Sequence, residues 1–454
     1  MRILQVSHGY PPDQMAGAEV YTWSVASEQA RRGHEVHVLA PGKRAGQLEH
    51  ALLEEELDGV RVHRLNQNFL GIDRLEKTYT DPDVDAVFTT LLERLKPDVV
   101  HVQHTIGVSA GVLRVAKRAG APLVMTLHDF WAHCPRGQRV TPRLHLCEQV
   151  EPWRCALCVG RKRAAYFVRW LAEYPKGRVR ESHGKSGLSK ALGFAPSALS
   201  YLASETWSAP ILRRSAHMLD ALLAADILLS PSNFLSERYA EQGVPRERIE
   251  FSEYGMNDAP FRALAPRAPR DAQRRPVKFG FTGTLIPNKG ADLLIEAFQK
   301  LPVGAATLDL FGAASGPSAA RYEAELRALN RHPGVQFRGR FDNRRIAQIL
   351  SELDVVVVPS RWWENAPLTI HEAVMARMPL VVANHGGMRE LAERFGNAAL
   401  FEPGSAADLE RALRRFLDEP AIWNELQPRR EVRSVSDDVD GLLARYERLT
   451  RGRQ

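Results

Sequence analysis

Short apolar runs alternate with helical patterns along most of the chain. An apolar run at 2–7 precedes a helical pattern over 18–32, and a second apolar run follows at 34–40. Unbroken runs of Val, Ile and Leu are typical of parallel strands that are covered on both faces. This alternation predicts a doubly wound α/β sheet. Its further strands are expected at 60–65, 98–103, 122–128, 226–230 and 249–252.

The alternation restarts after a stretch rich in Pro, Ala and Arg, which indicates a second domain. We predict an N-terminal domain over 1–255, a linker over 256–275 and a second domain over 276–430. Residues 431–454 are expected to form a helix that crosses back to the first domain. The strands of the second sheet are predicted at 277–283, 307–311, 334–338, 353–359, 380–384 and 398–401. Its helices are predicted at 290–300, 318–330, 343–350 and 368–377. Two such sheets leave a crevice at the carboxyl ends of their strands, where open α/β sheets bind ligands.

Composition limits the class of protein further. The 454 residues, 44% of them apolar and 25% charged, suit a globular protein of two or three domains. The chain turns polar soon after its first residues, and no run of about 18 apolar residues follows. We therefore expect a cytoplasmic protein. No Gly-x-Gly-x-x-Gly follows a predicted strand, which disfavours a nicotinamide dehydrogenase.

Residues 135–217 fit neither sheet and are expected to form an insertion in the first domain. Within it, residues 161–217 hold eleven Lys and Arg against three acids, more than the whole net charge of +7. Aromatic residues interleave with these charges, and 163–173 is predicted to be a short amphipathic helix. Such a helix suits an anionic membrane surface, and a solvated face with aromatics directed to the core is an equal alternative. Nothing resembles a nucleic-acid-binding module, so we expect no nucleic-acid partner.

All four cysteines of the chain lie in one stretch of 25 residues at the start of this insertion: Cys134, Cys147, Cys155 and Cys158. The last two form a Cys-x2-Cys pair, and the clustering predicts a structural zinc site with four thiolate ligands. Disulfides are the weaker alternative in a reducing cytosol, and a redox pair or unrelated thiols are further alternatives. The zinc site would fasten the insertion beside His128 rather than perform chemistry.

Two glutamates stand eight positions apart after the strand predicted at 353–359. Glu364 lies in a polar and aromatic loop, and Glu372 lies in the first turns of the next predicted helix. Both can face the crevice, where carboxylates accept hydrogen bonds from the neighbouring hydroxyls of a sugar or a ribose. Taken alone, the pair would more often be a helix-capping acid and a surface residue.

The residues around the two glutamates favour a functional role for the pair instead. The segment from Pro359 to Glu372 resembles the Glu-x7-Glu signature of family 4 retaining glycosyltransferases. Other segments resemble the same family in the same order along the chain: Tyr10-Pro11-Pro12 with Gly17 and Glu19, Thr126-Leu127-His128-Asp129, Ser230-Pro231-Ser232-Asn233-Phe234, Tyr254-Gly255-Met256-Asn257-Asp258, Gly283-Thr284-Leu285-Ile286-Pro287-Asn288-Lys289-Gly290 and Asn384-His385-Gly386-Gly387-Met388-Arg389-Glu390. The resemblance implies a GT-B fold, in which two Rossmann-like domains face a cleft. It also implies transfer of a hexose from a UDP- or GDP-sugar with retention of configuration.

The resemblance also assigns roles. Its catalytic residues are His128, Glu364 and Lys289, with His128 beside the reacting sugar, Glu364 on the sugar hydroxyls and Lys289 on the pyrophosphate. Glu372 would bind the ribose, and Gly17 would let backbone N–H groups at a helix start approach the pyrophosphate. The alternative for His128 is a strand-end histidine satisfied by Asp129. The implied donor-binding set is Gly17, Gly283, Thr284, Lys289, Asn365, Ala366, Pro367, Leu368 and Glu372.

One position departs from the family pattern, which places Arg where this chain has Thr284. A threonine donates a hydrogen bond but supplies no charge. Arg361, one loop away, is the candidate for a compensating cation; the alternative is that the loop tolerates Thr without compensation. The chemistry is expected to need no metal, because Lys289 and helix N-termini would stabilise the leaving group.

The expected partners are a nucleotide-sugar donor and an acceptor that is a surface glycan or is linked to a lipid. An anionic membrane is a further expected partner, which would place the protein at the inner face of the membrane. The rival hypotheses are a nucleotide-sugar epimerase or hydrolase on the same fold, and a non-catalytic homologue that binds a nucleotide-sugar.

Overall fold

The computed structural model describes residues 1–69, 72, 74–159, 199–264, 276–313 and 317–452, with only the backbone for 199–207 and 317–319. The amphipathic helix predicted at 163–173, most of the basic segment and residues 265–275 of the predicted linker lie outside the described residues. No described helix has the length and hydropathy needed to cross a membrane.

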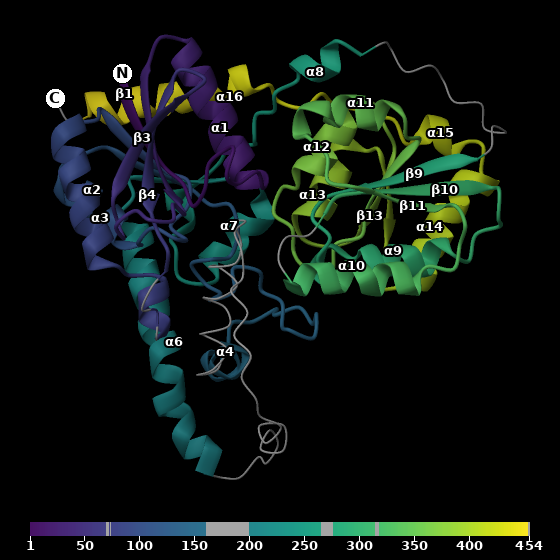
Figure 1. Ribbon diagram of the computed structural model, residues 1–454, viewed down its shortest axis with the longest axis horizontal. Helices are drawn as coiled ribbons and strands as arrows, with labels where there is room; N and C mark the ends of the chain where they lie inside the picture. Colours follow the sequence, from purple (N-terminus) through teal and green to yellow (C-terminus); the bar gives the residue numbers. More distant parts are fainter. Residues whose placement is uncertain (70–71, 73, 160–198, 265–275, 314–316, 453–454) are drawn as a thin grey trace.

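The first domain is built on an eight-stranded sheet in the order β3-β4-β2-β1-β5-β6-β7-β8 (Figure 1). Every neighbouring pair is parallel except β3 and β4. The strands are β1 (Arg2–Val6), β2 (Glu35–Gly42), β3 (Leu52–Leu57), β4 (Val60–Asn66), β5 (Val99–Val102), β6 (Leu123–Thr126), β7 (Ile227–Ser230) and β8 (Ile249–Phe251). The helices are α1 (Gly17–Arg31), α2 (Pro82–Leu95), α3 (Gly111–Arg118), α4 (Pro152–Val159), α6 (Leu199–Leu223) and α7 (Asn233–Ala240).

The second domain is built on a six-stranded, fully parallel sheet in the order β11-β10-β9-β12-β13-β14. Helix α8 (Ala259–Arg262) comes between the two sheets in the chain. The strands are β9 (Val277–Thr282), β10 (Ala306–Phe311), β11 (Val335–Gly339), β12 (Val355–Val358), β13 (Leu380–Ala383) and β14 (Ala398–Phe401). The helices are α9 (Ala291–Phe298), α10 (Pro317–Leu329), α11 (Ile346–Ser351), α12 (Leu368–Met375), α13 (Gly386–Phe395), α14 (Ala406–Asp418) and α15 (Ile422–Glu425). Two Rossmann-like domains side by side confirm the predicted fold class (Figure 1).

Strand β3 was missing from the sequence prediction. Its residues Glu54, Glu55 and Glu56 are exposed, because β3 forms the edge of the sheet, where charged side chains discourage pairing with another chain. Asp58 and Gly59, with φ of 52° and 77°, form the tight turn to β4. This Asp-Gly pair was the available signal for a hairpin.

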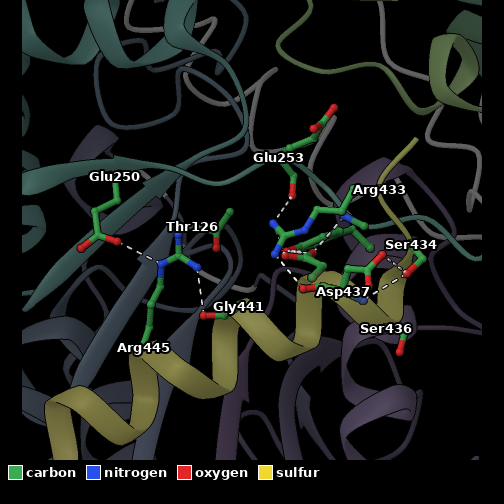
Figure 2. Close-up of polar contacts among 12 residues, drawn as sticks. Thr126, Glu250, Glu253, Arg433, Ser434, Ser436, Asp437, Gly441 and Arg445 are labelled. Carbon is green, nitrogen blue, oxygen red and sulfur yellow. Dashed lines mark hydrogen bonds and ion pairs between the residues drawn. The ribbon is translucent and has the colours of Figure 1, made fainter. Parts of the chain in front are cut away.

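Helix α16 (Val435–Arg451) returns from the second domain and packs against α1 of the first (Figure 1). Two arginines fasten it, as Figure 2 shows. Nε of Arg445 lies 3.0 Å from Oε2 of Glu250, and Nη1 of Arg433 donates to the carbonyl of Glu253 at 3.2 Å. The chain therefore crosses between the domains twice, near α8 and again before α16.

A glycine fixes the loop that follows β9. Gly290 has a φ of +74°, and a Cβ at this position would lie 2.1 Å from the carbonyl oxygen of Pro359 at the end of β12. The backbones of these two loops can approach so closely only because residue 290 has no side chain. The contact places the neighbouring residue, Lys289, at the end of β12.

We predict that Gly290→Ala destabilises the second domain much more than Gly304→Ala. Gly304 has a φ of +84° but open space around its Cβ position, so its substitution should cost only the backbone strain, about 1 kcal/mol. Gly290→Ala adds a collision with backbone and should cost about 3 kcal/mol or more. Thermal unfolding of both variants measures the difference. Equal losses of melting temperature would contradict the close approach.

Candidate active site

Lys289 and Glu364 meet at the carboxyl edge of the second sheet. Lys289 ends the short 3-10 helix after β9, and Glu364 lies in the loop after β12. Nζ of Lys289 lies 2.6 Å from Oε1 of Glu364. The same oxygen accepts hydrogen bonds from Ser360 Oγ at 2.8 Å and Trp362 Nε1 at 2.9 Å. Three donors hold this oxygen in place, while within the described chain the other oxygen, Oε2, has no such partner and can accept from a ligand.

Glu372 lies on α12 and is 7% exposed. Burial raises the pKa of its carboxyl group to about 7. Among the residues that the structure describes, its carboxylate has no hydrogen-bond or ion-pair partner. A buried carboxylate without a partner is unfavourable, and such residues are concentrated at binding and catalytic sites. Glu372 is therefore suited to accept hydrogen bonds from a bound ligand.

The N-termini of α1 and α12 face each other across the two domains. Gly17 and Leu368 are their first residues, and a Cβ at Gly17 would lie 3.7 Å from Cγ of Leu368. The residues that precede the helices, Ala16 and Pro367, provide no side-chain cap. Uncapped N–H groups and the positive ends of two helix dipoles favour an anion here.

Gly283 and Thr284 follow β9 on the same edge. Gly283 has a φ of +154° and pairs through its N–H with the carbonyl of Phe311 at 3.0 Å. Arg361, the candidate for a compensating cation, has its guanidinium 2.8 Å from the carboxylate of Asp292. The charge of Arg361 is thus already paired with Asp292, and the half-buried Thr284 adds none.

Asn365 joins the two domains rather than standing open in a cleft. Its Oδ1 accepts from Ser232 Oγ, and its Nδ2 donates to the carbonyl of His128 at 3.2 Å. The next residues, Ala366 and Pro367, lead into α12, and Ala366 is buried. The side chain of Asn365 therefore ties the donor-side loop to the first domain.

Glu390 makes a second link between the domains. It lies on α13, and its carboxylate accepts from the backbone N–H of Asn233 at 3.0 Å and of Phe234 at 2.9 Å, at the start of α7. An acidic side chain at a helix N-terminus stabilises that helix. Gly387, one turn earlier, donates its N–H to the carbonyl of Glu364 at 2.9 Å, so the same turn supports the loop that holds Glu364.

His128 is held by two side chains from the segments that follow β5 and β8. Its Nε2 lies 2.9 Å from Oε1 of Gln103, and its Nδ1 lies 2.5 Å from the hydroxyl of Tyr254. Burial and then neighbouring histidines keep the pKa of His128 well below its ordinary value, so the ring is neutral. The structure does not pair it with Asp129, whose carboxylate instead lies 3.3 Å from Nε2 of His104.

Sequence reasoning missed a hollow in the first domain. It lies at the carboxyl ends of β1, β2 and β4, and its lining includes His8, Glu19, Lys43, Gln67 and Phe69. Nε2 of His8 lies 3.2 Å from Oε1 of the buried Glu19. Burial alone would lower the pKa of His8, but the Glu19 carboxylate raises it overall. The available signal was the position of His8 directly after β1, at the edge where such sheets bind ligands.

Comparison with known proteins agrees with this architecture. The family described as "Glycosyl transferase 4-like domain" matches residues 16–156, and the family "Glycosyl transferases group 1" matches residues 267–432. The glycogen synthase of Mycobacterium tuberculosis (strain ATCC 25618 / H37Rv) is 25% identical over 96% of this chain and 91% of its own length. The glycogen synthase of Edwardsiella ictaluri (strain 93-146) is 31% identical over 38% of each chain. The first three curated relatives are matched over only 38% to 51% of their own length.

A solved structure shows the same fold over the whole chain. Alr3699/HepE from Anabaena, in complex with UDP and glucose, is 18% identical with a TM-score of 0.55, covering 100% of this chain and 98% of its own. The two facing Rossmann-like domains form the GT-B fold, and each is matched by one of these glycosyltransferase families. Within that class, the chain belongs to the family 4 type, as its motifs led us to expect.

The pKa of Glu372 predicts an unusual effect of its substitution on stability. Because folding raises this pKa from 4.5 to about 7, the contribution of Glu372 to stability is full below pH 4.5 and is lost as the pH rises through 7. Glu372→Gln should therefore be as stable as the wild type near pH 4.5 and more stable at pH 8, by up to about 3 kcal/mol.

Melting temperatures of both proteins from pH 4.5 to 8 measure this effect. Glu352→Gln, which replaces an exposed glutamate, should follow the wild type over the whole range. A Glu372→Gln variant that loses stability at pH 8 would show that Glu372 is ionised and paired in the folded protein.

Proposed function

We propose that this chain transfers a hexose from a UDP- or GDP-sugar to an acceptor hydroxyl with retention of configuration. The observation that carries the proposal is the ion pair of Lys289 and Glu364 at the carboxyl edge of the second sheet, next to helix α12, which carries Glu372 and begins beside the start of α1. The unpartnered carboxylate of Glu372 suits the two hydroxyls of a ribose, and Oε2 of Glu364 suits a hydroxyl of the sugar. The diphosphate then falls between the two helix N-termini and Lys289.

Leaving-group stabilisation follows from this placement. Charge develops on the diphosphate as the bond to the sugar breaks, and fixed positive groups already aimed at it lower the barrier. Lys289 and the uncapped N–H groups of α1 and α12 supply that charge without a metal ion. In this proposal Lys289 is the side chain that contributes, since Thr284 is neutral and Arg361 contacts Asp292, and the contact of Lys289 with Glu364 at 2.6 Å holds its ammonium group at the site.

Glu364 is not placed as a nucleophile in this proposal. A retaining glycosidase uses one carboxylate to form a covalent intermediate. Here three donors hold Oε1 of Glu364, and Oε2 binds the sugar hydroxyl, so the departing phosphate takes the proton of the incoming acceptor on the same face of the sugar. The neutral ring of His128 can hydrogen-bond to the sugar without adding a charge that would oppose the cationic transition state.

The acceptor site we propose is the hollow lined by His8, Glu19 and Lys43 in the first domain. The His8–Glu19 pair can bind acceptor hydroxyls as donor and as acceptor of hydrogen bonds. The acceptor class we propose is a surface glycan or a lipid-linked sugar. The basic, aromatic residues 161–217 motivate this choice, together with binding to the inner face of an anionic membrane.

A screen of nucleotide-sugars tests which nucleotide the protein binds. Thermal shifts should be measured with UDP-, GDP- and ADP-sugars, because only a ligand that binds the folded protein raises its melting temperature. UDP-sugars come first, since the similar solved structure holds UDP and glucose. Binding of the preferred donor should strengthen as the pH rises through 7, where Glu372 ionises. If no nucleotide-sugar raised the melting temperature, the proposal would be contradicted.

Kinetics of three variants test the chemistry. Lys289→Ala and Glu364→Gln should each lower kcat/KM by about 100-fold or more, because both groups act on the transition state. Lys300→Ala removes a lysine that pairs with Glu410 away from the site and should keep full activity. NMR of the product should show the anomeric configuration of the donor. Conversion of the donor without any acceptor would instead favour an epimerase or hydrolase.

A further inference from the structure

The four cysteines lie on two segments, the loop after β6 and helix α4. The carbonyl of Cys134 accepts from the N–H of Gly137 at 2.8 Å and closes a tight turn. Cys147 follows a short antiparallel bridge and donates its N–H to the carbonyl of Arg139 at 2.8 Å. Cys155 and Cys158 are three residues apart on α4, so their side chains share one face of the helix. No disulfide joins any of the four.

Hydrogen bonds and packing join the segments that carry these cysteines. Nε of Arg139 donates to the carbonyl of Cys147 at 3.0 Å, and the N–H of Cys134 donates to the carbonyl of Phe130 at 2.8 Å. Helix α4, which carries Cys155 and Cys158, packs against α6, and α6 is bonded through Arg214 to the carbonyl of Ala132, two residues before Cys134. The four cysteines therefore lie on segments that meet at α6.

A fully buried arginine from α6 lies beside this region. Arg214 is 1% exposed, and its guanidinium donates to the carbonyls of Trp131 and Ala132 and lies 4.5 Å from the centre of the Trp131 ring. Within the described residues it has no carboxylate partner, and its Nε has no hydrogen bond. Ala132 lies two residues before Cys134, so this guanidinium lies next to the cysteine loop.

Arg139 repeats the arrangement on the other side of the loop. It is also 1% exposed, donates to the carbonyls of Cys147 and Glu148, and has an unpartnered Nη1. Within the described residues no carboxylate pairs with it, and the carboxylate of Glu241 pairs with Arg238. Two buried guanidinium groups without a carboxylate partner are expensive, so a compensating negative charge is expected next to them.

We propose that Cys134, Cys147, Cys155 and Cys158 bind one zinc ion, and that the resulting centre neutralises Arg139 and Arg214. Binding converts four thiols to thiolates and releases four protons, which leaves a centre of about two negative charges for two buried guanidinium groups. The charge balance favours a metal over four neutral thiols, and the closed set of four soft ligands is that of a structural zinc site.

Binding requires the sulfur atoms to draw together. In a tetrahedral site with Zn–S bonds of about 2.3 Å, the sulfurs lie about 3.8 Å apart. Within the described part of the chain, no three of the cysteine sulfurs lie within 4.8 Å of one another. Three potential ligand atoms do lie that close at His50, Asp81 and Asp83. Asp81 there caps the N-terminus of α2, so we assign that group no metal.

The zinc centre would support the contact between the domains beside the active site. The loop that begins at Cys134 continues to Gln138, whose Oε1 accepts from Asn288 of the second domain. The guanidinium of Arg139 lies 5.1 Å from the centre of the Trp363 ring. Asn288 and Trp363 are direct neighbours in the chain of Lys289 and Glu364, so a loop fixed by zinc also positions the loops that hold these two residues.

Metal analysis of the intact purified protein tests the proposal. Elemental analysis by mass spectrometry should find about one zinc ion per chain. A mercurial reagent that reacts with thiols should release this zinc. The protein loaded with Co2+ should show the thiolate-to-cobalt absorption of a tetrahedral site. Both measurements use the wild type and do not depend on the folding of a variant.

Substitution of single cysteines tests which residues bind the zinc ion. Cys155→Ser and Cys158→Ser should each retain less than about one tenth of the zinc in competition with a chelator. His145→Ala removes an exposed histidine of the same loop and should keep all of it. A wild-type protein without zinc after growth with added zinc would overturn the proposal. Bound iron with inorganic sulfide would also overturn it, in favour of an iron–sulfur cluster on the same ligands.

Discussion

The ion pair between Lys289 and Glu364 depends on a close crossing of two backbone segments that are 75 positions apart. Lys289 can reach the carboxylate only because Gly290 lets its loop rest on the carbonyl of Pro359 at the end of β12. Ser360 and Trp362 then fix the carboxylate oxygen from the same loop as Glu364. The charge distribution of the proposed donor site thus depends on the absence of one side chain.

The contacts between the domains complete this site. Asn365 and Glu390 extend from the second domain to backbone groups at the ends of β6 and at the start of α7. Helix α16 returns to the first domain and holds it from the other side. Because the two helix N-termini that face the proposed diphosphate belong to different domains, these links decide whether the positive ends act on the same ligand.

Stability and function oppose each other at several buried groups. The carboxylate of Glu372 is buried without a partner, and Arg139 and Arg214 are buried without a carboxylate among the described residues. Groups of this kind are unfavourable in an isolated fold and become favourable when a ligand or ion pairs with them. For this reason we assign a ribose to the first and a thiolate-bound metal to the other two.

Much of this architecture was determined by the sequence itself. Apolar runs and helical periods predicted both parallel sheets, because burial on both faces leaves a pattern that is local in the chain. The order of the short motifs gave the family, and Glu364, Glu372 and Lys289 could be named because each occurs within such a motif. Strand β3 was missed because an exposed acidic edge lacks the apolar pattern, although its Asp-Gly turn was visible.

Only the tertiary structure decided which groups pair with each other. Asp292 neutralises Arg361, Tyr254 and Gln103 hold His128, and Asn365 bonds to the first domain, over separations of up to 238 residues. His8 and Glu19 became partners because α1 packs beside β1. Periodicity reports whether a residue is buried, but the identity of its neighbour depends on how distant elements pack, and hydrogen bonds and pKa shifts follow from that neighbour.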